Sequence, residues 1–198
     1  MKRLLNIFLL LFIVISFTGC QAYEPISPHG YYSFLIKAKE FLAFCVYIAN
    51  TDNPYWGQIF SRLYYAFFTL ARMVHIGKTG QYEQEKHTVI WQQNKKEVRK
   101  KYGETLKHLR TYYDYDYASN TESIEELTKN LSFILNNRKA FDQLINDTNE
   151  QIEKFYKHER DKIDWNNKCK KEIESIIQAQ NDLEKVLNKL GAINTFKQ

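Results

Sequence analysis

Arginine and tyrosine side chains gather around residue 110, and these residue types are well suited to bind a phosphate or an aromatic base. Arg110 is followed at close intervals by Tyr112, Tyr113, Tyr115 and Tyr117. A guanidinium group binds phosphate, and tyrosine rings stack on bases or sugars. Arg110 and Tyr113 are therefore candidate ligand-binding residues. The alternative is that these tyrosines, half-buried, seal one end of a helical bundle.

Two further arginines are candidates for the same kind of ligand. Arg62 and Arg72 are ten residues apart in a stretch with helical spacing, which places them about 80° apart around the axis, on one broad face. The alternative is that they form surface salt bridges with Glu104 or Glu40.

Histidine and cysteine, the other residues with useful chemistry, are sparse. We expect His87 to cap or line the start of a helix rather than to act as a base, and Tyr64 and Tyr65 to belong to the core. The sequence has no Cys-x-x-Cys pair and no His-rich spacing, so we predict no metal site and no cofactor. Cys45 lies in an apolar run and is expected to be buried. The sequence alone does not decide whether Cys45 and Cys169 form a disulfide, because it does not show their geometry.

Helices must position these residues. Seven glycines and three prolines among 198 residues are too few for a turn-rich β fold. The 44% of hydrophobic and 15% of aromatic residues are too many for a disordered chain. Apolar spacing predicts helices over 32–49, 55–75, 104–113 and 121–155. We expect Gly77 and Gly80 to end the second of these helices, and Gly103 to break or kink the chain before the third.

The first twenty residues are typical of an export signal. A basic start, Lys2-Arg3, precedes an apolar run from Leu4 to Phe17 that is too short for an ordinary membrane span. Its end, the sequence FTGC, resembles a bacterial lipobox, in which cleavage precedes the cysteine and the thiol carries a lipid. We therefore expect lipidation of Cys20. Loss of Lys2 and Arg3 lowers the formal net charge from +5 to +3, which gives no independent reason to expect a nucleic-acid binder.

The C-terminal segment carries a heptad pattern. Seven positions, all apolar except Gln180, follow one another at alternating steps of four and three and form the seam of the pattern. They are Cys169, Ile173, Ile176, Gln180, Leu183, Leu187 and Leu190. This spacing predicts either a coiled coil that binds a partner through the 169–190 face, or an amphipathic helix packed on its own domain.

Several stretches in order resemble the HEPN family (higher eukaryotes and prokaryotes nucleotide-binding domain). The string SRLYYAFFTLAR at 61–72 resembles the second helix of that family, and the loop 77–87 leads to its Lys-His pair, here at 86–87. Leu109-Arg110 followed by DYDY at 114–117 resembles the family's Arg-x-x-Ala-Asp-Tyr segment, and 121–133 resembles the following helix start. The match covers residues 32–146.

The resemblance implies a four- or five-helix bundle that is usually dimeric. Relatives bind nucleotides, act as toxins, or cut RNA without a metal through an arginine and a histidine that are separated by four to six intervening residues. Here those positions hold Tyr115, Asp116 and Tyr117, none of them a histidine. Arg110, Tyr115 and Tyr117 are therefore the only catalytic candidates that the pattern offers, and Asp116 is expected to pair with Arg110.

Together these observations predict an all-α protein in four parts: a signal peptide (1–19), a tether (20–31), a HEPN-like bundle (32–150) and an amphipathic helical extension (151–198). We expect a dimeric, lipid-anchored binding protein of the cell envelope that recognises a protein or a nucleotide and is not an enzyme. The alternative is a cytoplasmic RNA-binding protein or metal-independent endoribonuclease.

Overall fold

Helices make up almost all of the computed structural model, which describes residues 26–52, 54–82, 87–116 and 124–195. The long helices are α2 (Pro28–Ala49), α3 (Trp56–Thr79), α7 (Ile124–Asn136), α8 (Arg138–Phe155) and α9 (Lys162–Thr195). Shorter segments are α4 (His87–Gln92), α5 (Lys96–Val98), the π-helical η1 (Arg99–Glu104), α6 (Thr105–Thr111), the π-helical η2 (Tyr112–Asp116) and the 3-10 turn η3 (Tyr156–His158). No strand occurs within these ranges, which confirms the predicted all-α class.

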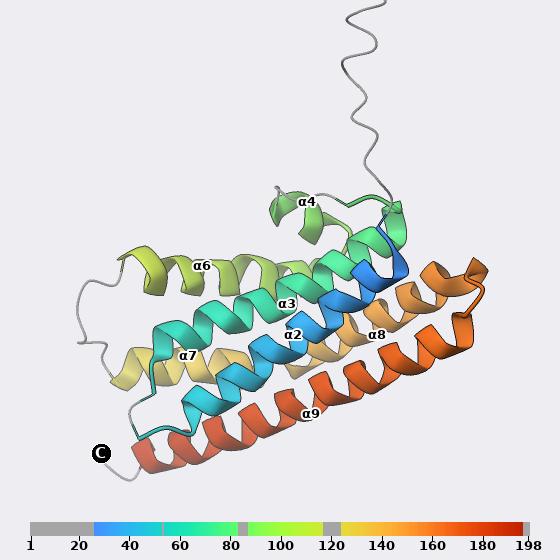
Figure 1. The fold of residues 1–198 in the computed structure, drawn as a ribbon. Coiled ribbons are helices and arrows are strands. Elements are labelled where there is room, and N and C mark those ends of the chain that lie inside the picture. The colour runs from blue at the N-terminus through green and yellow to red at the C-terminus, as the bar shows by residue number, and fades with distance from the viewer. Residues whose placement is uncertain (1–25, 53, 83–86, 117–123, 196–198) are drawn as a thin grey trace, which may run out of the picture.

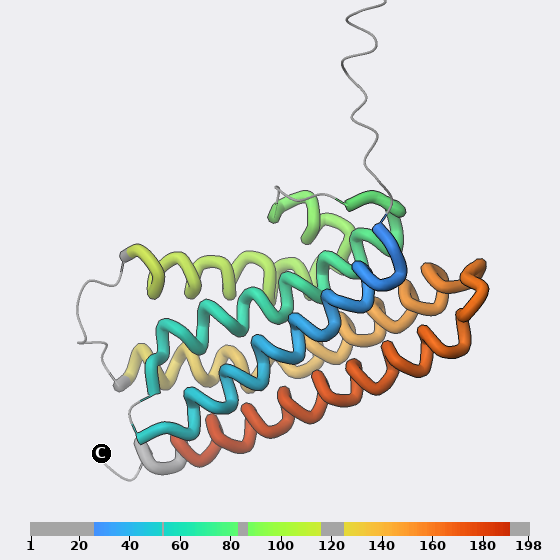
Figure 2. Tube along the Cα trace, viewed as in Figure 1, coloured from blue at the N-terminus to red at the C-terminus, as the bar shows by residue number. Residues whose placement is uncertain are grey.

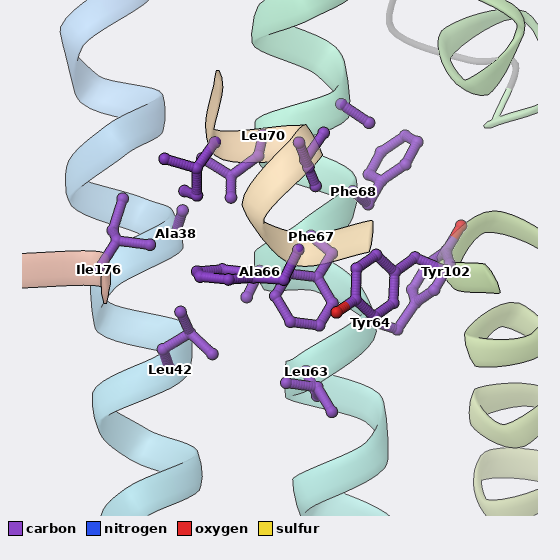
Figure 3. Packing of buried hydrophobic residues seen from close by; sticks show 14 of the residues in the cluster. Ala38, Leu42, Leu63, Tyr64, Ala66, Phe67, Phe68, Leu70, Tyr102 and Ile176 are labelled. Atoms are coloured by element: carbon purple, nitrogen blue, oxygen red, sulfur yellow. The ribbon is translucent and has the colours of Figure 1, made fainter. Parts of the chain in front are cut away.

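Helix α3 lies at the centre of the bundle, between α2 on one side and α6 on the other (Figure 1). Helix α8 packs against α3, and α9 runs alongside α2. The chain reverses at η3, so that α8 and α9 form an antiparallel pair (Figure 2). Rings and aliphatic side chains of α2, α3, η1 and α9 interdigitate in the core, as Ala38, Leu42, Phe67, Tyr102 and Ile176 show in Figure 3.

Helix α2 begins earlier than the sequence predicted. The hydroxyl of Ser27 accepts a hydrogen bond from the Gly30 backbone amide at 3.1 Å, and Pro28 occupies the first turn, where its missing N–H costs nothing. Tyr31 is fully buried and donates its hydroxyl proton to the Met73 carbonyl at 2.9 Å. The predicted tether over 20–31 is therefore wrong for its last residues, because those residues already belong to the bundle.

Of the two glycines expected to end α3, only Gly80 does so. Gly80 adopts a φ of 68°, the left-handed conformation that closes a helix. Gly77 lies inside the helix, where an added Cβ would come within 2.3 Å of the Gln151 Cβ. Gly77 therefore permits the close approach of α3 and α8.

Gly103 does not interrupt the helical chain from Lys96 to Asp116. It lies in the π-helical segment η1, and an added Cβ there would come within 2.9 Å of the Trp91 ring. The glycine is thus needed for contact with α4. Of the predicted break or kink at Gly103, the break is wrong, because the chain continues there as a π-helical segment.

The heptad seam of α9 faces its own bundle. Its positions Cys169, Ile173, Ile176, Gln180, Leu183 and Leu187 are all buried within the single chain, largely against α2. The seam from Cys169 to Leu187 therefore packs on its own domain, as the second of the two alternatives predicted. The predicted boundary at 150 is also wrong, because α8 runs through it and the C-terminal helix is part of the bundle core.

The two described cysteines are separate free thiols. Cys45 and Cys169 are both buried, and the Cys45 thiol donates to the Ile59 carbonyl at 3.5 Å. The predicted burial of Cys45 is confirmed. No described helix has the length and apolar character needed to cross a membrane. The predicted signal peptide and Cys20 lie outside the described residues.

Candidate functional site

Helix α3 is buried on every side except along one stripe. From Ile59 to Ile76, every side chain is buried except those of Arg62, Tyr65 and Arg72. Intervals of three and seven residues keep these three side chains on one helical face. We call them the α3 stripe. The structure thus places two candidate arginines from the sequence on the part of α3 that ligands can reach.

Aromatic rings hold both arginines of the stripe. The Arg62 guanidinium lies 5.7 Å from the centre of the Phe41 ring and 5.9 Å from that of Phe44. The Arg72 guanidinium lies 5.5 Å from the Phe34 ring and 5.0 Å from the Tyr82 ring. Such cation–π contacts fix a guanidinium while leaving its edge to donate hydrogen bonds. The rings therefore fix the positions of both guanidinium groups.

Arg110 joins the stripe from α6. Its Nη1 donates to the Tyr65 hydroxyl at 2.9 Å, and its Nε forms an ion pair with the Asp114 carboxylate at 3.5 Å. The Ser61 hydroxyl also donates to that carboxylate, at 3.3 Å. Asp114 lies four positions after Arg110, a spacing that a helix brings together. The side chain of Asp116, the predicted partner, lies outside the described part of the structure. These contacts tie Arg110 to α3 and lay its guanidinium over the Tyr65 ring, 5.5 Å from the centroid.

The tyrosines after Arg110 divide between the two predicted roles. Tyr113 stacks on the core residue Phe60 with ring centres 4.7 Å apart, and its hydroxyl accepts a bond from Asn130. Tyr113 therefore helps to seal the bundle end, which favours the second alternative for this residue. Tyr115 is 74% exposed and lies 5.8 Å from the Arg110 guanidinium. Tyr117 lies outside the described residues.

His87 opens α4, as expected, and it also lies beside the arginines. Its Nδ1 is 2.5 Å from the Tyr64 hydroxyl, and its ring stacks on Phe68 with centres 4.2 Å apart. Burial lowers the pKa of His87 below 6.5, and the positive charges of Arg110, Lys107 and Arg72 lower it further. The ring is therefore neutral at pH 7.

The proton positions of this pair follow from their pKa values. Burial raises the pKa of Tyr64 to about 12, so its hydroxyl stays protonated and is assigned as the donor to Nδ1. The neutral His87 ring then carries its proton on Nε2. A histidine placed this way offers its Nε2–H to a ligand as a hydrogen-bond donor.

A cavity of about 240 Å³ adjoins His87. Helix α4 forms one wall, and the helix of η1 and α6 forms the other. The lining residues are His87, Thr88, Trp91, Gln92, Arg99, Gly103, Glu104 and Lys107.

A larger but shallow depression of about 700 Å³ lies between α2 and α9. Lysines and carboxylates are mixed along it, as Lys39, Lys171, Glu174 and Asp182 show, and no aromatic or histidine side chain lines it. It therefore offers less specific chemistry than the region around His87.

The sequence analysis missed two features of this region. His87 was not considered as the histidine that acts with Arg110, because the family pattern places its histidine after the arginine and His87 precedes Arg110 in the chain. The basic character of the segment 95–110 was also missed. That segment carries seven basic side chains against two acidic ones: Lys95, Lys96, Arg99, Lys100, Lys101, Lys107 and Arg110, against Glu97 and Glu104. The run of charges is visible in the sequence and could have been found there.

Comparison of the chain with family models, curated proteins and solved structures gave no match. Within the described ranges, no group of three or more His, Cys, Asp or Glu side chains is placed to hold a metal ion.

Proposed function

We propose that this protein is a lipid-anchored helical module that binds nucleotides or RNA through the α3 stripe and Arg110. The observation that carries the proposal is the burial of α3 from Ile59 to Ile76 at every position except Arg62, Tyr65 and Arg72. This arrangement leaves two guanidinium groups and a tyrosine ring partly exposed on an otherwise buried stretch of a core helix. It provides hydrogen-bond donors for phosphate and a ring on which a base can stack.

The basic helix beside the stripe supports the same proposal. The excess of positive charge in 95–110 lies next to Arg110 on α5, η1 and α6, while the rest of the chain is close to neutral. A local field of this kind attracts phosphates and makes binding sensitive to salt. The HEPN resemblance, which implies a nucleotide-binding bundle that is usually dimeric, is part of this proposal.

Binding of a fluorescent single-stranded RNA and of labelled ATP tests the proposal. We expect Arg62→Ala and Arg72→Ala each to weaken binding at least several-fold and to reduce its salt dependence, because each removes a phosphate contact. Arg160→Ala is the matched control, since Arg160 is exposed on the turn between α8 and α9, outside the stripe. Equal affinities for all three variants would contradict the proposal.

The anchor is tested separately. The full chain, expressed in its host, is expected to incorporate radioactive palmitate, and Cys20→Ala is expected to abolish the label. A soluble, unlabelled wild-type protein that protease cannot reach from outside the cytoplasm would place the nucleotide-binding bundle in the cytoplasm instead.

One observation favours metal-independent RNA cleavage as a second candidate function. His87 and Arg110 both contact the Tyr64–Tyr65 pair, so a proton carrier and a phosphate-binding cation lie close together. With Nδ1 bonded to Tyr64, His87 presents its Nε2–H to a phosphate oxygen, and an arginine can stabilise the charge that develops on the phosphate, while the ribose 2′-hydroxyl proton passes to solvent. We expect His87→Gln and Arg110→Ala to abolish cleavage of a test RNA if this candidate is correct. Cleavage that persists in both variants would exclude it.

A further inference from the structure

The cavity beside α4 has the size of a fragment rather than of a whole nucleotide. Its volume of about 240 Å³ is below the roughly 300 Å³ at which pockets for drug-sized ligands begin. A group as small as a sugar phosphate suits this volume, and an attached base must lie outside it.

The charged side chains of the cavity suit a ligand that carries both a phosphate and hydroxyl groups. Arg99, Gly103 and Lys107 follow one another at intervals of four, so one helical face presents a guanidinium and an ammonium group. These two groups together suit a phosphate. Glu104, the one carboxylate among the lining residues, repels phosphate but accepts hydrogen bonds from hydroxyl groups. Carboxylates that bind ribose hydroxyls use the same chemistry.

The wall that carries these charges has an unusual backbone. Arg99, Gly103 and Glu104 all belong to the π-helical segment η1. Single π-helical turns are rare, and they occur frequently at functional sites. The absence of a side chain at Gly103 lets the Trp91 ring pack directly against this turn, so the indole forms the back of the cavity.

The cavity and the α3 stripe are connected through His87. The His87 ring lines the cavity, stacks on Phe68 and bonds Tyr64, while the neighbouring Tyr65 bonds Arg110. A base attached to a sugar phosphate in the cavity therefore has stacking partners within reach on the side of the stripe.

We propose that this cavity binds the ribose phosphate of a nucleotide, with Arg99 and Lys107 on the phosphate and Glu104 on the ribose hydroxyls. This inference rests on the proposed function, since it names the part of the nucleotide that the cavity takes. The ligand class is a ribonucleoside monophosphate or the phosphorylated end of an RNA.

Calorimetric titration of the full chain in detergent tests the inference. AMP and ribose 5-phosphate are expected to bind, and adenosine, which lacks the phosphate, is expected not to bind. Arg99→Ala and Lys107→Ala are each expected to weaken AMP binding about tenfold, the loss of one charge-assisted contact. Glu104→Ala, which removes the hydrogen-bond acceptor, is expected to remove the preference for AMP over its 2′,3′-dideoxy analogue.

The controls distinguish a failure of this inference from a failure of the proposed function. Lys189→Ala removes an exposed lysine of α9, outside both the cavity lining and the basic segment 95–110, and this variant should bind AMP like the wild type. Arg99→Lys retains the positive charge, so this variant should bind AMP more tightly than Arg99→Ala does. Circular dichroism checks that both variants are folded. AMP affinity that Arg99→Ala and Lys107→Ala leave unchanged overturns the inference. If Arg62→Ala and Arg72→Ala still weaken binding in that case, the proposed function stands. If no nucleotide or RNA binds, both fail.

Discussion

The Tyr64 hydroxyl lies 2.5 Å from the Nδ1 of His87, although 23 positions separate the two residues in the chain. Tyr64 is on the buried side of α3, and His87 is the first residue of α4. The contact fastens a short helix to the central one. It also keeps the imidazole partly buried and among three positive side chains; burial and these charges lower the pKa of His87.

The first prediction concerns pH. The folded-state pKa of His87 lies below 6.5 because of burial and the nearby charges of Arg110, Lys107 and Arg72. Between that value and 6.5, the unfolded chain binds the proton and the folded chain does not. The free energy of unfolding therefore decreases as the pH falls through this window. Urea unfolding at closely spaced pH values between 5 and 7.5 measures the effect.

His87→Gln should remove this part of the pH dependence, and His158→Gln, at an exposed position, should retain it. Identical pH profiles for the wild type and His87→Gln would contradict the assignment. An imidazole resonance that titrates above 6.5 in NMR spectra would do the same.

The second prediction concerns the contact between α3 and α8. Gly77→Ala places a Cβ within 2.3 Å of the Gln151 Cβ, too close to the backbone of α8 for a simple rotation to relieve. We expect a loss of about 1–3 kcal/mol in the free energy of unfolding, the usual cost of overpacking. Thermal and urea unfolding measure this loss.

Gly57→Ala is the matched control on the same helix. Its added Cβ would lie 3.5 Å from the nearest atom of Tyr113, an ordinary contact, so stability should stay the same or rise by a few tenths to about 1 kcal/mol. Equal stability of the two variants would show that α3 and α8 are less closely packed than described.

The third prediction concerns the heptad seam. Leu183 is fully buried against the bundle, so Leu183→Ala is expected to cost about 2–5 kcal/mol of stability. The mass of the protein in solution should not change, because the seam faces its own chain. Asn188→Ala, on the exposed side of α9, is the control. A change of oligomeric state with little loss of stability would indicate that the seam serves a partner.

The fourth prediction concerns the thiols. Burial raises the pKa of Cys45 to about 12 and that of Cys169 to about 11. Because the thiolate is the reactive form, neither should react with Ellman's reagent at pH 8 in folded Cys20→Ala protein. Unfolding in guanidinium should release both. Rapid labelling of the folded protein, or a disulfide between Cys45 and Cys169 in its peptide map, would disagree with the structure.

The helices of this protein could be predicted well from local patterns, and their boundaries less well. The apolar spacing correctly predicted α2 and α3, and the spacing of Arg62 and Arg72 correctly predicted a shared face. Pro28 was misread as part of a tether because a proline in the first turn of a helix and a proline in a linker look alike in sequence. Gly77 and Gly103 were misread as helix breakers. A glycine can also be required because a neighbouring helix packs too closely to leave room for a side chain, and the local sequence does not show that neighbour.

The sequence by itself determined the all-α class, the arginines that lie on one face of a helix, and the seam of α9. Each of these depends on helical periodicity, which neighbouring residues fix. The tertiary structure decided what each face meets: that α9 covers α2 in the same chain, that His87 lies beside Tyr64, and that α4 and η1 enclose a cavity. These contacts join residues far apart in the chain, and periodicity shows that a face is buried without showing its partner.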